Sequence, residues 1–255
     1  MTHVSYSFDV VDFGANWEMV ETHRRNLLIK LRLFLYICLL RGRGPAAAIL
    51  LLSPGSGLTM HKRKPEIMPA DLLAKVMDAA VFAAQKHQFQ RRAGYDKLPY
   101  MNHLLKVAEA LIRIGEERDE ALLLAAILHD VLEDTDATHE ILAGRFGREA
   151  ADIVLELTDD MNLPYMERKW LQVEKAHLLT EKARKIRLVD KATNIRDILT
   201  YPLNWPLEKK EAYLENAIQV VGRIRGGNPR LDDWFDQTVE WARERLTELG
   251  AAPPK

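Results

Sequence analysis

The residues best suited to chemistry lie where a long apolar run turns abruptly acidic. Residues 121–134 read ALLLAAILHDVLED, so His129, Asp130, Glu133 and Asp134 follow a segment without any charge. On a helix, positions 129 and 133 are one turn apart, and so are 130 and 134. We therefore expect nitrogen and oxygen ligands to project from one patch at the end of a buried helix.

A bound cation is the chemistry that this patch indicates. Carboxylates near the C-terminal end of a helix oppose its dipole, and burying them is costly unless an opposite charge compensates. A divalent ion compensates them directly, and it lowers the pKa of bound water so that a nucleophile exists near neutral pH. Glu133 and Asp134, one turn from the expected ligands, could exchange protons with that water or with a leaving oxygen.

Two residues elsewhere in the chain complete the expected ligand set. His103 begins another expected helix, and Asp190 lies within the helical pattern IRLVDKATNIRD. Two histidines and two aspartates suit Mn²⁺, Fe²⁺ or Zn²⁺, and the lack of thiolate ligands argues against a structural zinc cage. Each residue alone also has an ordinary explanation: a buried core histidine, a polar helix end, or an ion pair of Asp190 with Arg187 or Lys191. The combination favours a metal site.

Helical periodicity extends over nearly the whole chain from Pro69 onward. Proline in a first turn, Asp119 as an N-terminal cap and Gly115 as a helix end mark the boundaries. We expect helices over residues 69–84, 103–115, 119 through the apolar run, 138–145, 148–157, 165–176, 181–199, 207–224, and from the GGNP break to about 248. No segment shows sustained period-two alternation, so the predicted fold class is all-α.

Composition limits the classes of partner. The chain has 255 residues, 36 basic and 37 acidic, with a formal net charge of -1, so bulk electrostatics predict no nucleic-acid or membrane affinity. The single cysteine, Cys38, excludes an intramolecular disulfide and is typical of a reducing compartment, for which we expect a cytoplasmic location.

The N-terminal part of the chain differs from the rest. Its apolar run at 27–40 contains Lys30 and Arg32, and it is too short and too polar for a membrane span or a signal peptide. We interpret residues 1–66 as an extension, either disordered or the product of a mis-called start, and residues 67–250 as the folded domain. A basic amphipathic membrane contact at 24–43 is the rarer alternative.

The motifs together resemble a known family. The set His103, His129-Asp130 and Asp190 resembles that of the HD-domain metal phosphohydrolases. The surrounding segments AAILHDVLEDT, TDD, ERKWLQVE and LVDKATNIRDI are similar to the hydrolase domain of RelA/SpoT proteins, and above all to the small alarmone hydrolases that include the metazoan SpoT homologue. The resemblance covers residues 69–230 approximately.

The resemblance implies a fold, a cofactor and a reaction. It implies a bundle of about eight to ten helices with one Mn²⁺ ion. It implies a guanosine nucleotide substrate, the tetra- or pentaphosphate, whose 3′-pyrophosphate is hydrolysed to give GDP or GTP plus pyrophosphate. Carried over position by position, the metal ligands are His103, His129, Asp130 and Asp190, the residues that activate water are Glu133 and Asp134, and the nucleotide contacts are Asn194 and, against the purine, Arg92.

Other substrate contacts and other functions remain open at this point. Lys191 and Arg196 flank Asn194 and are our candidates for binding phosphate, while the family's lysine after Arg92 is Ala93 here. The resemblance also allows an HD hydrolase of another nucleotide, such as one removing the 2′-phosphate of NADPH. A third alternative is a non-catalytic nucleotide-binding module. The sequence predicts no oligomeric state.

Overall fold

The computed structural model describes residues 68–93, 98–201 and 203–251, and these residues form helices joined by short loops. The order is α2 (Ala70–Lys86), α3 (Met101–Arg113), α4 (Glu120–Leu128), α5 (Val131–Asp134), α6 (His139–Phe146), α7 (Arg148–Leu157), α8 (Tyr165–Glu174), the 3₁₀ turn η2 (Ala176–Leu178), α9 (Glu181–Thr200), α10 (Leu207–Gly222) and α11 (Pro229–Ala251). Over this part of the chain the only strand-like pairing is an isolated bridge between Arg91 and Pro99. The prediction of an all-α fold is confirmed.

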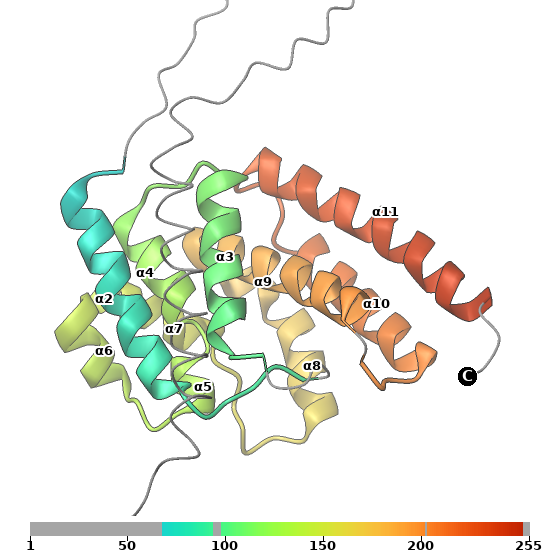
Figure 1. The fold of residues 1–255 in the computed structure, drawn as a ribbon, viewed down its shortest axis with the longest axis horizontal. Coiled ribbons are helices and arrows are strands. Elements are labelled where there is room, and N and C mark those ends of the chain that lie inside the picture. Colours follow the sequence, from blue (N-terminus) through green and yellow to red (C-terminus); the bar gives the residue numbers. More distant parts are fainter. Residues whose placement is uncertain (1–67, 94–97, 202, 252–255) are drawn as a thin grey trace, which may run out of the picture. The chain divides into compact units, whose positions relative to one another are not determined.

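Two helices hold the domain together. Every residue from Leu122 to Leu128 of α4 is buried, and this helix packs against α2, α3, α7 and α9. The longer α9 packs against α3, α7, α10 and α11, and Figure 1 shows it running between α3 and α10. An all-round apolar helix such as α4 can only be stable at the centre of a domain. The metal-site candidates lie where α3, the end of α4 and α9 meet.

Local sequence signals set most helix boundaries. Asp119 caps α4 by accepting a hydrogen bond from the Leu122 N–H at 2.9 Å, as its position before the apolar run predicts. Thr180 caps α9 in the same way, and Pro164 precedes α8. The helices expected from periodicity occur within a few residues of their predicted bounds.

The chemical residues of the first patch follow a break in the helix. The apolar run forms α4, which ends at Leu128 as expected, but the helical spacing assumed for residues 129–134 is interrupted, because α5 begins only at Val131. Asp130 lies between them with φ −100° and ψ −2°. Neighbouring side chains on an ideal helix point about 100° apart; here His129 Nε2 and Asp130 Oδ2 lie 3.1 Å from each other.

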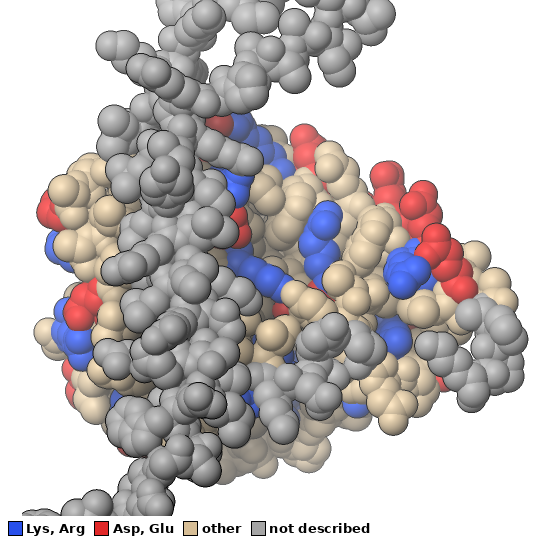
Figure 2. Space-filling view, viewed as in Figure 1, with Lys and Arg blue, Asp and Glu red and all other residues tan. Residues whose placement is uncertain are grey.

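Several interpretations concern residues outside the described part of the chain. The N-terminal extension, 1–66, lies there, and so does the basic segment at 24–43. Among the described residues, no helix combines the length and the apolar character needed to cross a bilayer. On the face seen in Figure 2, where grey atoms do not cover it, acidic and basic side chains are interspersed.

Candidate active site

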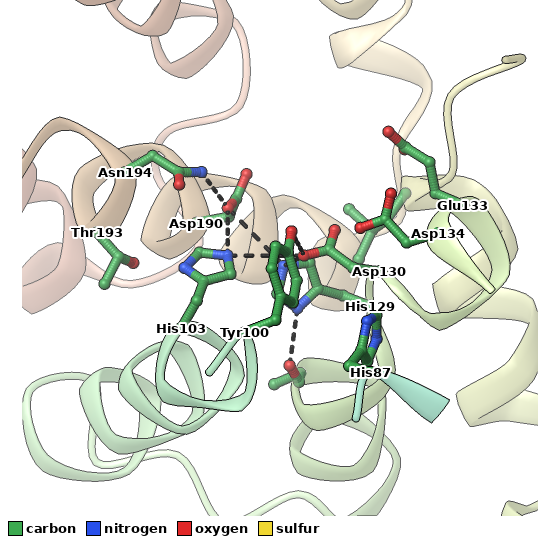
Figure 3. Close-up of polar contacts among 12 residues, drawn as sticks. His87, Tyr100, His103, His129, Asp130, Glu133, Asp134, Asp190, Thr193 and Asn194 are labelled. Atoms are coloured by element: carbon green, nitrogen blue, oxygen red, sulfur yellow. Dashed lines mark hydrogen bonds and ion pairs between the residues drawn. The ribbon is translucent and has the colours of Figure 1, made fainter. Parts of the chain in front are cut away.

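Four side chains from three separate segments converge at the centre of the domain. His103 comes from the first turn of α3, His129 and Asp130 from the break after α4, and Asp190 from the middle of α9. The Nε2 of His103 lies 3.1 Å from Asp190 Oδ1 and 3.7 Å from Asp130 Oδ2. The Nε2 of His129 lies 3.1 Å from Asp130 Oδ2 and 3.8 Å from Asp190 Oδ1. Figure 3 shows the four side chains directed toward one another.

These separations suit a single cation. Ligand atoms bonded at about 2.1 Å to one ion lie roughly 3.0–3.5 Å apart in octahedral or tetrahedral arrangements. The ring of His129 supplies a second observation, because its Nδ1 lies 2.9 Å from the Ala126 carbonyl and must donate there. Its Nε2 is buried without a hydrogen-bond partner, although it lies at ion-pair distance from Asp130. An ion between these atoms would satisfy it.

The short distances between the histidines and the aspartates also shift their pKa values. Burial disfavours a charged His129, yet the negative charges of Asp130 and Asp190 prevail and raise its pKa to about 10. Burial would likewise raise the pKa of Asp190, but His103 and His129 hold that pKa well below its ordinary value. A proton on His129 therefore supplies the positive charge that the two carboxylates attract, and binding of a divalent ion at the same nitrogen would release that proton.

Two further side chains hold the carboxylates in place. The Tyr100 hydroxyl donates to Asp130 Oδ2 at 2.7 Å, and Asn194 Nδ2 donates to Asp190 Oδ1 at 2.6 Å. Burial and the nearby charge of Asp130 raise the pKa of Tyr100 well above its ordinary value, so it stays a hydrogen-bond donor. The prediction of a site role included Asn194 but missed Tyr100, whose only sequence signal is its place three residues before His103.

Glu133 and Asp134 lie beside the cluster but do not join it (Figure 3). Glu133 Oε2 accepts a hydrogen bond from the Asp159 backbone N–H at 3.0 Å, and Asp134 Oδ2 accepts one from Gln90 at 2.8 Å. Burial is the main cause that raises the pKa of Glu133, and the neighbouring carboxylates of Asp159 and Asp130 add to it. A carboxyl group that holds its proton more firmly suits proton transfer near neutral pH.

Arg92 also reaches this region. Its Nη2 donates to Asn194 Oδ1 at 2.5 Å and lies 3.2 Å from Asp197 Oδ2, while its guanidinium lies over the Tyr100 ring at 5.4 Å. Asp197 also accepts a hydrogen bond from Lys106 Nζ at 2.6 Å. Sequence reasoning missed Asp197, although positions 190, 194 and 197 share one helical face.

The structure does not bring the two expected phosphate-binding cations to the cluster. Lys191 is 2% exposed, and its Nζ donates to Gln172 Oε1 at 2.7 Å. Arg196 packs on α11, where its Nε donates to Thr238 and its guanidinium lies over the rings of Trp234 and Trp241. Arg196 is two residues after Asn194 and points to the opposite side of α9, whereas Lys191 points about 100° away from its neighbour Asp190 and is buried against Gln172.

Comparison with known proteins gives consistent matches. A family model described as an HD domain matches residues 79–202. The chain is 43% identical over 164 residues to the guanosine-3′,5′-bis(diphosphate) 3′-pyrophosphohydrolase MESH1 of Xenopus tropicalis, covering 64% of this chain and 92% of the relative. The corresponding human protein is 40% identical over 161 residues, covering 63% and 90%.

A solved structure agrees with these relatives. It is described as a metazoan ortholog of SpoT that hydrolyzes ppGpp and plays a role in starvation responses. It aligns with a TM-score of 0.63 and 39% sequence identity over 66% of this chain and 95% of its own. The helices that position the candidate site are thus part of a fold shared with this protein.

Proposed function

The chain belongs to the HD-domain family of guanosine-3′,5′-bis(diphosphate) 3′-pyrophosphohydrolases, and from that membership we propose that it hydrolyses the 3′-pyrophosphate of guanosine tetra- or pentaphosphate. The products are GDP or GTP and pyrophosphate. The observation that carries the proposal is the convergence of two imidazole nitrogens and two carboxylate oxygens in a chain that covers nine-tenths of such relatives.

A divalent metal is implied by the HD domain, and we assign it to His103, His129, Asp130 and Asp190. Mixed nitrogen and oxygen donors without thiolates suit Mn²⁺, which is the ion that we propose. When bound, such an ion polarises a phosphoryl oxygen and makes water more acidic. The chain's own part is to hold the carboxylates in position, which Tyr100 and Asn194 do through their hydrogen bonds.

Proton transfer falls to Glu133 and Asp134. The pKa of Glu133 is raised by burial, so this residue can hold a proton and release it to the 3′ oxygen as the phosphorus–oxygen bond breaks. Asp134 is held by Gln90 and can accept the proton of the attacking water. Both roles require only that the carboxyl groups of Glu133 and Asp134 keep the orientation that their hydrogen bonds give them.

Arg92 and Asn194 supply contacts for the nucleotide. The Arg92 guanidinium already lies over an aromatic ring, Tyr100, and the same planar group can lie against a purine. Asn194 links Arg92 to Asp190, so nucleotide binding and the metal site share one hydrogen-bonded network. We place the enzyme in the cytoplasm, the compartment that a chain with one cysteine suits.

Product analysis tests the proposal. Purified protein is incubated with Mn²⁺ and guanosine tetraphosphate, and in parallel with NADPH. We expect GDP and pyrophosphate from the first and loss of both products in the Asp130→Ala variant, which removes a ligand. Orthophosphate from NADPH, with no turnover of guanosine tetraphosphate, would replace the proposal with the other nucleotide hydrolase. Nucleotide binding without any turnover would indicate a non-catalytic module.

A further inference from the structure

Arg168 on α8 is an enclosed cation with weak partners. Its side chain is 16% exposed, and its Nε is buried without a hydrogen-bond partner among the described residues. One terminal nitrogen, Nη1, contacts the sulfur of Met161, and the Tyr165 ring lies 5.9 Å from the guanidinium carbon. A thioether is a poor acceptor, so most of the five N–H donors of this group have no strong partner.

Neighbouring arginines show the contrast. Arg184 donates to the carbonyls of Leu179 and His177, and Arg187 donates to the carbonyl of Leu157. These guanidinium groups serve to close helix and loop ends. Among the described residues, the Arg168 side chain reaches no backbone carbonyl, and the one carboxylate within ion-pair distance is that of Glu133, whose Oε1 lies 3.9 Å from Nη1. A buried cation with so little compensation is costly unless an anion arrives.

The loop that contains Asp159 is anchored by residues other than Arg168. Asp159 accepts a hydrogen bond from Gln172 at 2.7 Å and lies 3.4 Å from Lys169 Nζ, while Gln172 accepts one from Lys191. Lys169, next to Arg168, is therefore engaged in holding the segment whose backbone N–H binds Glu133. The Arg168 side chain, in contrast, does not anchor this segment, and it lies near the Glu133 carboxyl group.

The proposed reaction brings an anionic group close to Glu133 and Arg168. Glu133 has the carboxylates of Asp130, Asp134 and Asp159 around it, and the bond broken next to it releases pyrophosphate, which is strongly anionic. We infer that Arg168 binds the departing pyrophosphate, an inference that rests on the proposed hydrolysis. A guanidinium offers a planar fork that binds phosphate oxygens in pairs, and it stabilises the negative charge of the pyrophosphoryl group while water attacks its phosphorus and the ribose 3′ oxygen departs. When the Arg168 side chain turns toward the phosphate, its ion pair with Glu133 is broken.

Product inhibition tests this role on the full chain loaded with Mn²⁺. Arg168→Met keeps an apolar side chain of similar reach and removes the fork, and Arg168→Lys keeps the charge. We expect Arg168→Met to weaken inhibition by inorganic pyrophosphate about tenfold or more and to leave inhibition by GDP nearly unchanged. Arg168→Lys should fall between. The control is Arg223→Met, which removes an arginine paired with Glu174 at the far end of α8 and should change neither constant.

The outcomes separate the alternatives. A lower kcat with unchanged pyrophosphate inhibition would mean that Arg168 only orients Glu133, and it would overturn the inference. If the wild-type chain released no pyrophosphate from guanosine tetraphosphate, the proposed function would fail, and calorimetric binding of pyrophosphate by wild type and Arg168→Met would still decide on Arg168. If circular dichroism showed that Arg168→Met is unfolded, the folded Arg168→Lys variant would replace it in the comparison. We expect pyrophosphate to inhibit Arg168→Lys several-fold more weakly than wild type. Unchanged inhibition of Arg168→Lys would overturn the inference.

Discussion

The Tyr100 hydroxyl gives the sharpest test of how the site is held. Tyr100→Phe removes the hydrogen bond to Asp130 Oδ2 at 2.7 Å and keeps the ring, which is stacked on His87 at 5.0 Å and lies under Arg92. A hydrogen bond to a charged acceptor contributes about 1.5–3 kcal/mol. Loss of a partner to a metal ligand weakens metal binding by about 10- to 100-fold, which is about 1.4–2.8 kcal/mol. The two arguments agree, so we expect Mn²⁺ affinity to fall by that factor.

The assay is calorimetric titration of metal-free protein with Mn²⁺, together with activity measured against Mn²⁺ concentration. At saturating Mn²⁺ the kcat should return to within a few-fold of wild type, because Tyr100 is not assigned to the chemistry. Tyr165→Phe is the matched control, since it removes the same hydroxyl from a half-exposed ring on α8. Wild-type Mn²⁺ affinity in Tyr100→Phe would refute the reasoning about how Asp130 is fixed.

Three other predictions follow from the same geometry. Glu133→Gln should keep Mn²⁺ affinity within about threefold and lower kcat by a factor on the order of 10² or more, measured by steady-state kinetics; full rate would remove Glu133 from proton transfer. Because the metal-free pKa of His129 is raised from 6.5 to about 10, its stabilising charge is fully present below pH 6.5 and is lost as pH rises toward 10. Thermal unfolding from pH 6.5 to 9 should therefore show a falling midpoint without Mn²⁺ and a smaller fall with it, and equal slopes would contradict this. A chain beginning at Met68 should retain kcat and KM within about twofold, since the relatives align over 164 residues; a large loss would assign a role to residues 1–66.

Much of the helical framework could be predicted because the signals are local. Asp119, Thr180 and Pro164 act on their own helices, and the apolar run at 121–128 allows only a buried position. The break at Asp130 could not be predicted in this way, because residues 127–135 contain no Pro or Gly and are also compatible with a continuous helix. The approach of His129 and Asp130 to His103 and Asp190 depends on tertiary packing.

Helical geometry explains which of the predicted site residues the structure brings together and which it does not. Asp190 and Asn194 are four apart and meet on one face, where Asp197 completes the series. Lys191 and Arg196 were chosen because they are close to Asn194 in sequence, but they contact Gln172 and α11 instead. Helical spacing explains the position of Arg196, whereas the contact of Lys191 with Gln172 on α8 depends on tertiary packing.

The convergence of α3, the α4–α5 break and α9 has a consequence for the life of the protein in the cell. The ion that we propose at His103, Asp130 and Asp190 would link segments that are far apart in the chain, much as a covalent cross-link does. Each tenfold excess of free metal over its dissociation constant then adds about 1.4 kcal/mol to the free energy of unfolding. If the proposed divalent ion binds there, the amount of folded protein that escapes proteolysis will follow the supply of that metal, so metal starvation should lower the enzyme's abundance as well as its activity.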